Sequence, residues 1–389
     1  MKILAIETSC DDTGIAILEY GKTGQPKISA DLISSQTKIH APWGGVVPML
    51  AKREHQRNLV PLLIKALKKS ALLKTKSLKL KTKNQKPKTL GSILEREPEL
   101  LKKLLPLLKK YQKPDINYIA VTVGPGLEPA LWVGINFARA LSYFWEIPII
   151  PINHIEGHLC ANFADGEVSA YYKLLFPAIS LVVSGGHTQL ILIKSVGRYK
   201  IIGETRDDAA GEAFDKVAKM LNLGYPGGPI ISELAISYKL KAISSKFSLP
   251  RPMINSGDFD FSFSGLKTAV LYALQKMTPA QIKKQTPAIA AEFQQAVIDV
   301  LTAKAISTAK KYKAKTIMLA GGVASNQSLR QALAEKAKES DIAFSVPDAH
   351  LCTDNAAMIG LAAFYNLKIS RAKKADWRAL KAQANLRVS

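Results

Sequence analysis

Two stretches of the chain share one pattern of apolar and polar positions. Residues 2–7 and 13–19 are apolar runs joined by a short polar turn. Residues 177–183 and 188–193 repeat this pattern around a turn that contains two adjacent glycines. Short apolar runs bounded by turn residues are typical of strands. The repetition therefore predicts two related lobes with a cleft between them.

Other apolar runs alternate with helical patterns. Residues 116–123, 147–152 and 315–320 predict buried strands, and residues 131–144 predict a helix after the first of them. Strands that alternate with helices are the signature of an α/β protein, because each crossover helix covers a face of the sheet. We therefore predict an α/β fold.

A region rich in lysine separates the first helical pattern from the strand at 116–123. Residues 57–72 have apolar positions at helical spacing, although Pro61 fits only near a first turn. Residues 74–113 then predict an insertion, whose first part has no periodicity and is predicted to be loop or disordered. Its second part carries a stripe of leucines, but Pro98 and Pro106 predict that no long helix forms there.

Composition and charge narrow the class of protein. Of the 389 residues, 47% are hydrophobic, and no run approaches the ~18 apolar residues of a membrane-spanning helix. The N-terminus lacks the features of a signal peptide, and three scattered cysteines form no disulfide framework, which predicts a cytoplasmic protein with no membrane partner.

The formal net charge is +23, and residues 68–113 hold fourteen lysines and one arginine against three glutamates, a net charge of +12. This segment is either a solvated lysine-rich loop or an arm that contacts RNA phosphates, and the composition alone leaves both interpretations open.

His154 and His158 stand four residues apart at the start of a predicted helix. That spacing puts both imidazoles on one helix face, close enough to share a metal ion. Histidines at this spacing also serve in capping and packing, so a third ligand is needed. Asp354 is the candidate, and its alternative role is the N-cap of the helix that follows. Two histidines and one carboxylate suit Fe(II) or Zn(II) and leave positions open for substrate.

Glycine turns at strand ends suit a bound nucleotide, because backbone N–H groups can approach an anion where no Cβ intervenes. These turns contain Gly185–Gly186, Gly227–Gly228 and Gly321–Gly322. Asp215, on a predicted helix, is either a ligand of ribose hydroxyls or an exposed helix acid. Asp11, between two strands, is either a catalytic carboxylate or an ordinary turn residue.

The longer motifs resemble those of the tRNA adenosine threonylcarbamoyltransferase family, and they follow in order along nearly the whole chain outside residues 74–113. They are Glu7–Gly14, Gly44–Pro48, Gly124–Leu127, His154–His158, Val183–Thr188, Asp208–Lys216, Tyr225–Pro229, Ala320–Asn326 and Cys352–Asn355.

The resemblance implies an actin/Hsp70/sugar-kinase-like fold with duplicated RNase H-like lobes. The N-terminal lobe is expected over 1–150, and a C-terminal lobe with the metal and nucleotide site over 151–365. The segment 366–389 is expected to return to the N-terminal lobe.

The resemblance also implies a reaction. The threonylcarbamoyl group of threonylcarbamoyl-adenylate would pass to N6 of the adenosine 3′ to the anticodon, in tRNAs that read codons beginning with A, with release of AMP. One divalent metal, Fe(2+) in preference to Zn(2+), would lie on His154, His158 and Asp354, and Asp11 would be catalytic. The expected substrate-binding residues are Val182, Val183, Ser184, Gly185, Gly186, Asp215, Gly228 and Asn326. The implied partners are tRNA, a smaller inactive paralogue and an ATPase subunit.

The chain departs from the family pattern at Met49 and at Glu128–Pro129, which bears on lobe packing or partner contacts rather than on the ligands. Three other functions are less well supported. A zincin-type metallopeptidase needs HExxH, and here Ile155 follows His154. A sugar kinase of this fold has no use for two metal-binding histidines, and an inactive RNA-binding scaffold would have lost the ligands.

Overall fold

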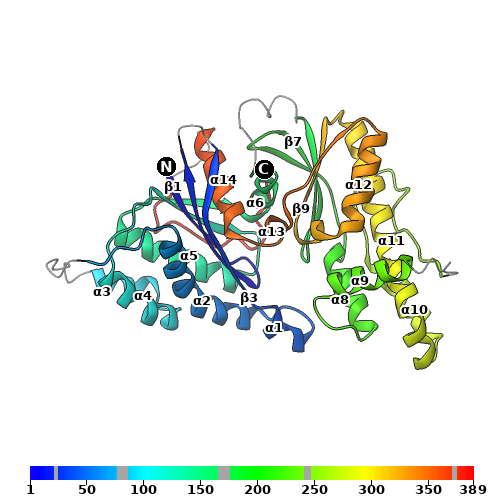
Figure 1. Ribbon diagram of the computed structural model, residues 1–389, viewed down its shortest axis with the longest axis horizontal. Coiled ribbons are helices and arrows are strands. Elements are labelled where there is room, and N and C mark those ends of the chain that lie inside the picture. The colour runs from blue at the N-terminus through cyan, green and yellow to red at the C-terminus, as the bar shows by residue number, and fades with distance from the viewer. Residues whose placement is uncertain (22–24, 77–85, 165–175, 241–246, 370–374) are drawn as a thin grey trace. The chain divides into compact units, whose positions relative to one another are not determined.

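The computed structural model describes residues 1–21, 25–76, 86–164, 176–240, 247–369 and 375–389, and it divides into two compact units. The first unit comprises Met1–His40, Val46–Val168 and Asp354–Val388, and the second comprises Ala41–Gly45 and Ser169–Thr353. Each unit has its own sheet and its own hydrophobic core (Figure 1).

The first unit is built on a five-stranded sheet in the order β3-β2-β1-β4-β5. Its strands are β1 (Lys2–Glu7), β2 (Asp12–Tyr20), β3 (Pro26–Ser35), β4 (Tyr118–Gly124) and β5 (Ile149–Asn153). The first three form an antiparallel meander, and β4 and β5 continue the sheet parallel to β1.

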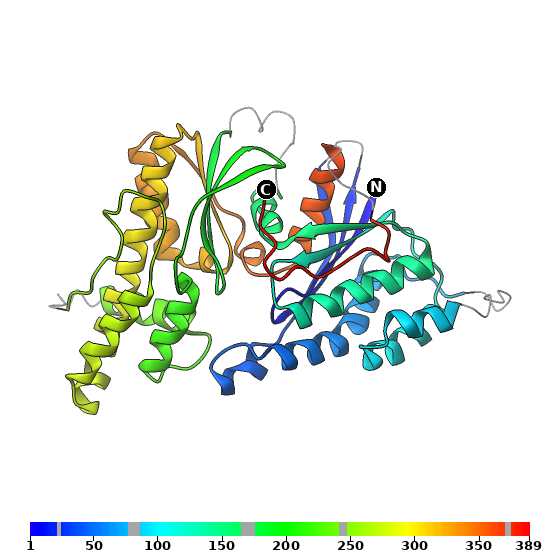
Figure 2. The same ribbon diagram turned by 180° about the vertical axis from the view of Figure 1, so that it is seen from behind.

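Seven helices belong to the described part of the first unit, and four of them, α2, α5, α6 and α14, contact its sheet. The seven are α1 (Thr37–His40), α2 (Pro48–Lys69), α3 (Lys86–Ile93), α4 (Pro98–Lys110), α5 (Glu128–Trp145), α6 (His154–Ala161) and α14 (Ala356–Lys368). Helices α2 and α5 contact the sheet and each other, and α14 packs on β1, β2 and α6. Residues 375–388 run beside β5 and α5 (Figure 2), where the Ala375 N–H donates to the Ile149 carbonyl over 3.0 Å.

The second unit repeats this strand order, as β8-β7-β6-β9-β10. Its strands are β6 (Ala178–Val183), β7 (Thr188–Ser195), β8 (Arg198–Glu204), β9 (Thr316–Ala320) and β10 (Ala343–Ser345). Again a three-stranded antiparallel meander is extended by two parallel strands. The repeated order is that of duplicated RNase H-like lobes, so the predicted α/β fold class is confirmed.

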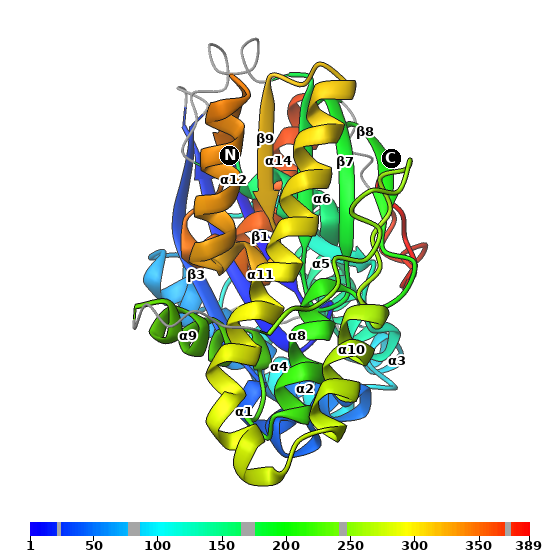
Figure 3. The ribbon, with the colours of Figure 1, turned by 90° about the vertical axis from the view of Figure 1, so that its right-hand side faces the viewer.

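The long helix α11 (Pro279–Lys311) packs on β6 and β9 and on the neighbouring helices of the second unit (Figure 3). The remaining helical segments of this unit are η1 (Ala41–Trp43), α8 (Ala210–Met220), α9 (Gly227–Leu240), α10 (Ser264–Gln275), η2 (Gly322–Ser325), α12 (Gln327–Glu339) and α13 (Ala349–Cys352). No helix in the described ranges has both the length and the apolar composition that crossing a membrane requires.

Two helix predictions based on proline were wrong. Pro61 lies in the interior of α2, and α4 continues through Pro106. A proline inside a helix leaves the carbonyl four residues earlier without its N–H donor. In α2 that carbonyl belongs to Arg57, and the Lys103 ammonium of α4 donates to it over 2.9 Å. The tertiary contact between the two helices therefore compensates for the missing bond.

The first compact unit extends past residue 150. Strand β5 pairs with β4, and α6 packs on α14, so β5 and α6 belong to the first unit, which the chain re-enters at Asp354. Both histidines and Asp354 therefore belong to the first unit rather than to the second.

Candidate functional site

Helix α6 starts directly after β5 and carries both histidines of the predicted pair. Asn153 caps this helix, because its side-chain oxygen accepts the N–H groups of Ile155, at 2.8 Å, and Glu156, at 3.3 Å. His154 and His158 then lie one turn apart on the same face, with their ring centroids separated by 4.7 Å. The cap thus fixes the turn that brings the two imidazoles together.

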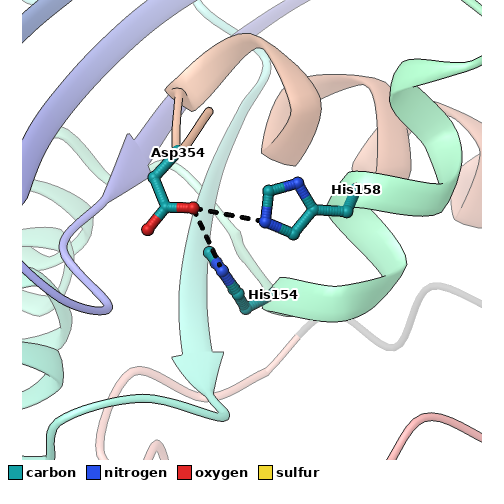
Figure 4. A group of neighbouring side chains, drawn as sticks. All are labelled: His154, His158 and Asp354. Atoms are coloured by element: carbon teal, nitrogen blue, oxygen red, sulfur yellow. Dashed lines mark ion pairs between the residues drawn. The ribbon is translucent and has the colours of Figure 1, made fainter. Parts of the chain in front are cut away.

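Asp354 faces both histidines from the short connection between α13 and α14 (Figure 4). Its Oδ1 lies 3.4 Å from Nε2 of His154 and 3.2 Å from Nε2 of His158. The alternative role of Asp354 as an N-cap is wrong. Asn355 caps α14 instead, and its side-chain oxygen accepts the Met358 N–H over 2.8 Å.

Glu7, at the end of β1, holds His154 from the other side and was not predicted as a site residue. Its Oε2 lies 3.2 Å from Nδ1 of His154 and accepts a 2.6 Å hydrogen bond from the Thr122 hydroxyl. Glu7 is fully buried. A carboxylate on Nδ1 leaves Nε2 available to a metal and fixes the ring orientation. No sequence signal joins residues 7 and 154, since only the pairing of β1, β4 and β5 brings them together.

Burial and the neighbouring charges shift the pKa values of His154, His158 and Asp354. Burial would lower the pKa of His154, but Asp354 and Glu7 raise it to about 10. Burial lowers the pKa of His158 below its ordinary value. Burial would raise the pKa of Asp354, yet the two imidazoles hold it well below its usual range. The pocket therefore stabilises a positive charge between the buried Glu7 and the half-buried Asp354.

These side chains fit a divalent metal. One donor atom from each of His154, His158 and Asp354 lies within 4.8 Å of the others. Nδ1 of His158 is buried and makes no hydrogen bond in the described part of the chain, while its Nε2 faces Asp354. Two imidazole nitrogens and one carboxylate oxygen suit Fe(II) or Zn(II) with coordination positions left open.

Asp11 lies at the turn between β1 and β2, and Asp12 is the first residue of β2. Burial raises the pKa of Asp11, and the negative charge of Asp354 raises it further. Burial, with the same carboxylate, raises the pKa of Asp12 to about 7. The predicted catalytic residue thus lies within electrostatic reach of Asp354, one of the candidate metal ligands. Asp12 was not singled out from the sequence, where it reads as one more turn residue.

The second unit contains a cavity of about 560 Å³, within the ~300–1,000 Å³ typical of small-molecule sites. Among the predicted substrate residues, Gly185, Asp215, Gly228 and Asn326 line this cavity. Ser184 and Gly186 belong to the same β6–β7 turn as Gly185, and the Ser184 hydroxyl accepts the N–H groups of Gly186 and His187. Val182 and Val183 lie in β6 with fully buried side chains.

A hydrogen-bond network in the wall of the cavity sets the position of Asn326. The Asn326 side-chain oxygen caps α12 by accepting the Leu329 N–H over 3.0 Å. Its amide donates to Ser232 and to the buried Gln294, both over 2.8 Å. Ser232 and Gln294 lie inside helices α9 and α11, where nothing in the sequence marks them as part of a site.

Asp215 is held on the cavity wall by the following glycine turn. The Gly227 N–H donates to Asp215 Oδ1 over 2.7 Å. A Cβ at Gly227 would lie 2.6 Å from the Phe214 carbonyl oxygen, so only glycine allows this close approach.

The chain matches the family model described as "tRNA N6-adenosine threonylcarbamoyltransferase" over residues 27–79 and 95–361. The predicted insertion over 74–113 was therefore too long, because only residues 80–94 separate the two matched stretches. Helix α4 lies within the matched part and buries four leucines in the core of the first unit: Leu100, Leu104, Leu107 and Leu108.

Among solved structures, the chain resembles full-length HypF in its phosphate- and nucleotide-bound form. The identity is 12% and the TM-score 0.52, over 96% of this chain and 47% of HypF. This likeness concerns the fold alone.

Relatives with the same name as the family model match almost end to end. The protein of Syntrophomonas wolfei is 41% identical over 366 residues, which cover 94% of this chain and 92% of the relative. That of Fusobacterium nucleatum is 42% identical over 376 residues, which cover 96% and 94%. The chain therefore belongs to the TsaD family, the tRNA N6-adenosine threonylcarbamoyltransferases.

Proposed function

We propose that this chain transfers the threonylcarbamoyl group of threonylcarbamoyl-adenylate to N6 of the adenosine 3′ to the anticodon, in tRNAs that read codons beginning with A. The transferred carbonyl carbon leaves the adenylate phosphate oxygen and forms a bond with N6, which loses a proton, and AMP is released. One observation carries the proposal: in a chain of this family, one donor atom from each of His154, His158 and Asp354 lies within 4.8 Å of the others.

The three ligands define what the first unit contributes. His154 and His158 each offer Nε2 and Asp354 offers a carboxylate oxygen, while Glu7 holds the His154 ring through Nδ1. We propose one divalent ion, Fe(2+) in preference to Zn(2+). When bound, it supplies a Lewis acid that polarises a carbonyl or phosphate oxygen.

The cavity of the second unit is the proposed adenylate site. Asp215 offers a carboxylate to ribose hydroxyls, and Asn326, whose amide N–H groups donate to Ser232 and Gln294, offers its side-chain oxygen. Gly185 and Gly228 expose backbone at the cavity wall, and a Cβ built on either glycine would meet no heavy atom within 4 Å beyond the adjacent chain. The remaining proposed contacts come from the backbone of the β6 end and its turn: Val182, Val183, Ser184 and Gly186.

Asp11 is proposed to orient or accept a proton from the attacking amine. An exocyclic adenine amine is a weak nucleophile, so a nearby base helps only as the new bond forms. Burial raises the pKa of Asp11, which strengthens it as a base.

The proposed partners are tRNA, a smaller inactive paralogue and an ATPase subunit, and the proposed location is the cytoplasm. The net charge of +23 supports a polyanionic partner.

The test uses the metal-loaded chain with its partner proteins, synthetic threonylcarbamoyl-adenylate and unmodified tRNA. We expect threonylcarbamoyladenosine in the digested tRNA and one AMP for each modified nucleoside, measured by liquid chromatography and mass spectrometry. A tRNA with guanosine in place of the target adenosine is the control and should remain unmodified. AMP release without nucleoside modification would indicate a hydrolase and contradict the proposal.

A further inference from the structure

A second, smaller cavity in the second unit is not accounted for by the adenylate site. Its volume is about 290 Å³, close to the lower end of the ~300–1,000 Å³ found for small-molecule sites. The residues that give it chemical character are Trp43, Asp215, Lys219, Asn222 and Tyr225. Asp215 also lines the larger cavity, so the two cavities adjoin at this residue.

Trp43 presents its indole to solvent at the rim of this cavity. The residue is 65% exposed, the largest fraction among the exposed large hydrophobic residues of the described chain. Leaving an indole in water forfeits the burial of a large apolar surface, and exposed aromatic residues beside a cavity are a common mark of binding sites. The isolated position of Trp43 on the short η1 segment leaves its ring open to a planar ligand.

Lys219 supplies a positive charge next to the indole. A Cβ built on Gly44, the neighbour of Trp43, would lie 3.4 Å from the Lys219 Nζ atom. Within the described residues, the Lys219 ammonium makes no ion pair or hydrogen bond, whereas Lys216 one turn earlier is paired with both Asp208 and Glu212. The acidic residue of the cavity, Asp215, already accepts the Gly227 N–H.

An exposed aromatic face with an unpaired ammonium beside it matches a nucleotide: the base stacks on the ring and the phosphate lies on the cation. We propose that this cavity binds one unstacked nucleotide of the RNA substrate, with its base on Trp43 and its phosphate at Lys219. The inference rests on the proposed function, because the shared Asp215 would place this nucleotide beside the adenylate.

The first test compares RNA binding by the metal-loaded wild type and by Trp43→Ala and Trp43→Phe, using an unmodified anticodon stem-loop. Loss of one stacked base should weaken binding roughly ten-fold for Trp43→Ala, and Trp43→Phe should retain most of the affinity. Tyr272→Ala, which removes another strongly exposed aromatic, 59% exposed on α10, is the matched control and should bind as the wild type does. Equal affinities for the wild type and Trp43→Ala would overturn the proposal, and would leave the exposed indole to a protein partner.

The second test asks about the phosphate. Lys219→Ala should lower the slope of log Kd against log salt concentration by about one, the loss expected for one phosphate contact. Lys216→Ala is the control, since that ammonium is already paired, and its slope should equal that of the wild type. A slope unchanged by Lys219→Ala would contradict the assigned phosphate contact.

Free AMP separates the two sources of a nucleotide. RNA should quench the fluorescence of the wild type but not that of Trp43→Phe, and AMP should not reproduce this difference. If AMP quenches the wild-type fluorescence as strongly as RNA does, and RNA does not compete with AMP for the site, the assignment of the cavity to RNA is overturned. If the wild type transfers the threonylcarbamoyl group and Trp43→Ala binds RNA as tightly as the wild type does, this site alone is refuted. If RNA binding depends on Trp43 but the wild type transfers nothing, the proposed function alone is refuted.

Discussion

At the scale of single residues, the proposed metal centre includes a carboxylate that is not itself a proposed ligand. Glu7 contacts Nδ1 of His154 and is held by the Thr122 hydroxyl. The helical spacing of His154 and His158 was enough to predict that they share a face, because i and i+4 always do. Glu7 could not be predicted in this way, since strand pairing brings it there from 147 residues away.

Glu7→Gln should weaken metal binding about 10- to 100-fold, because the amide keeps the shape but loses the charge that orients and polarises His154. Competition with a calibrated chelator measures this affinity. Glu19→Gln, on the adjacent strand β2, is the matched control and should bind metal like the wild type. An unchanged affinity in Glu7→Gln would show that the contact has no effect on the ligand.

A second residue-scale prediction concerns acid stability. His55 is fully buried and neutral: its Nε2–H donates to the Cys10 carbonyl over 2.9 Å, and Nδ1 accepts from the Thr13 hydroxyl over 2.8 Å. Burial lowers its pKa to about 4, from an ordinary value of 6.5. The unfolded chain therefore binds the additional proton between these values, and the folded protein loses stability as the pH falls from about 6.5 to 4.

The contribution of His55 to the free energy of unfolding, present above pH 6.5, is up to about 3 kcal/mol. Urea unfolding of His55→Asn across this range should show a shallower loss of stability than the wild type. Identical pH slopes in the two proteins would contradict a neutral buried His55.

At the scale of elements, apolar runs predicted seven of the described strands, but β3, β8, β10 and the long helix α11 were not predicted. Proline was also a poor guide. Pro61 was expected near a first turn and Pro106 at a break, yet both lie inside helices. A proline is unfavourable in a helix partly because it lacks the N–H that would donate to the carbonyl four residues earlier. The sequence cannot show that Lys103, from another helix, donates to the Arg57 carbonyl in place of Pro61. Residues 77–85, predicted as part of a lysine-rich loop, lie outside the described residues.

Helix α4 should contribute to the core rather than form a detachable insertion. Leu104 is fully buried, so Leu104→Ala should lower the free energy of unfolding by about 2–5 kcal/mol. Lys102→Ala, on the exposed face of the same helix, should change it by less than about 0.5 kcal/mol. Urea denaturation provides both values, and a Leu104→Ala effect as small as that of Lys102→Ala would show that α4 packs weakly.

At the scale of the whole molecule, the duplication was predictable from two strand–turn–strand patterns, and both sheets have the same strand order. The division into units was not, because it depends on long-range packing. Helix α14, late in the chain, packs on β1, β2 and α6 and brings Asp354 to the histidines of the first unit. The site therefore joins residues from three distant parts of the chain in one compact unit.

The central claim is that His154, His158 and Asp354 bind the metal on which threonylcarbamoyl transfer depends. The most direct measurement determines metal content and transfer to tRNA in parallel for the wild type, His158→Ala and the exposed-histidine control His350→Ala. We predict one metal per chain and full transfer for the wild type and His350→Ala, and loss of both for His158→Ala. Full transfer by metal-free His158→Ala would contradict the account.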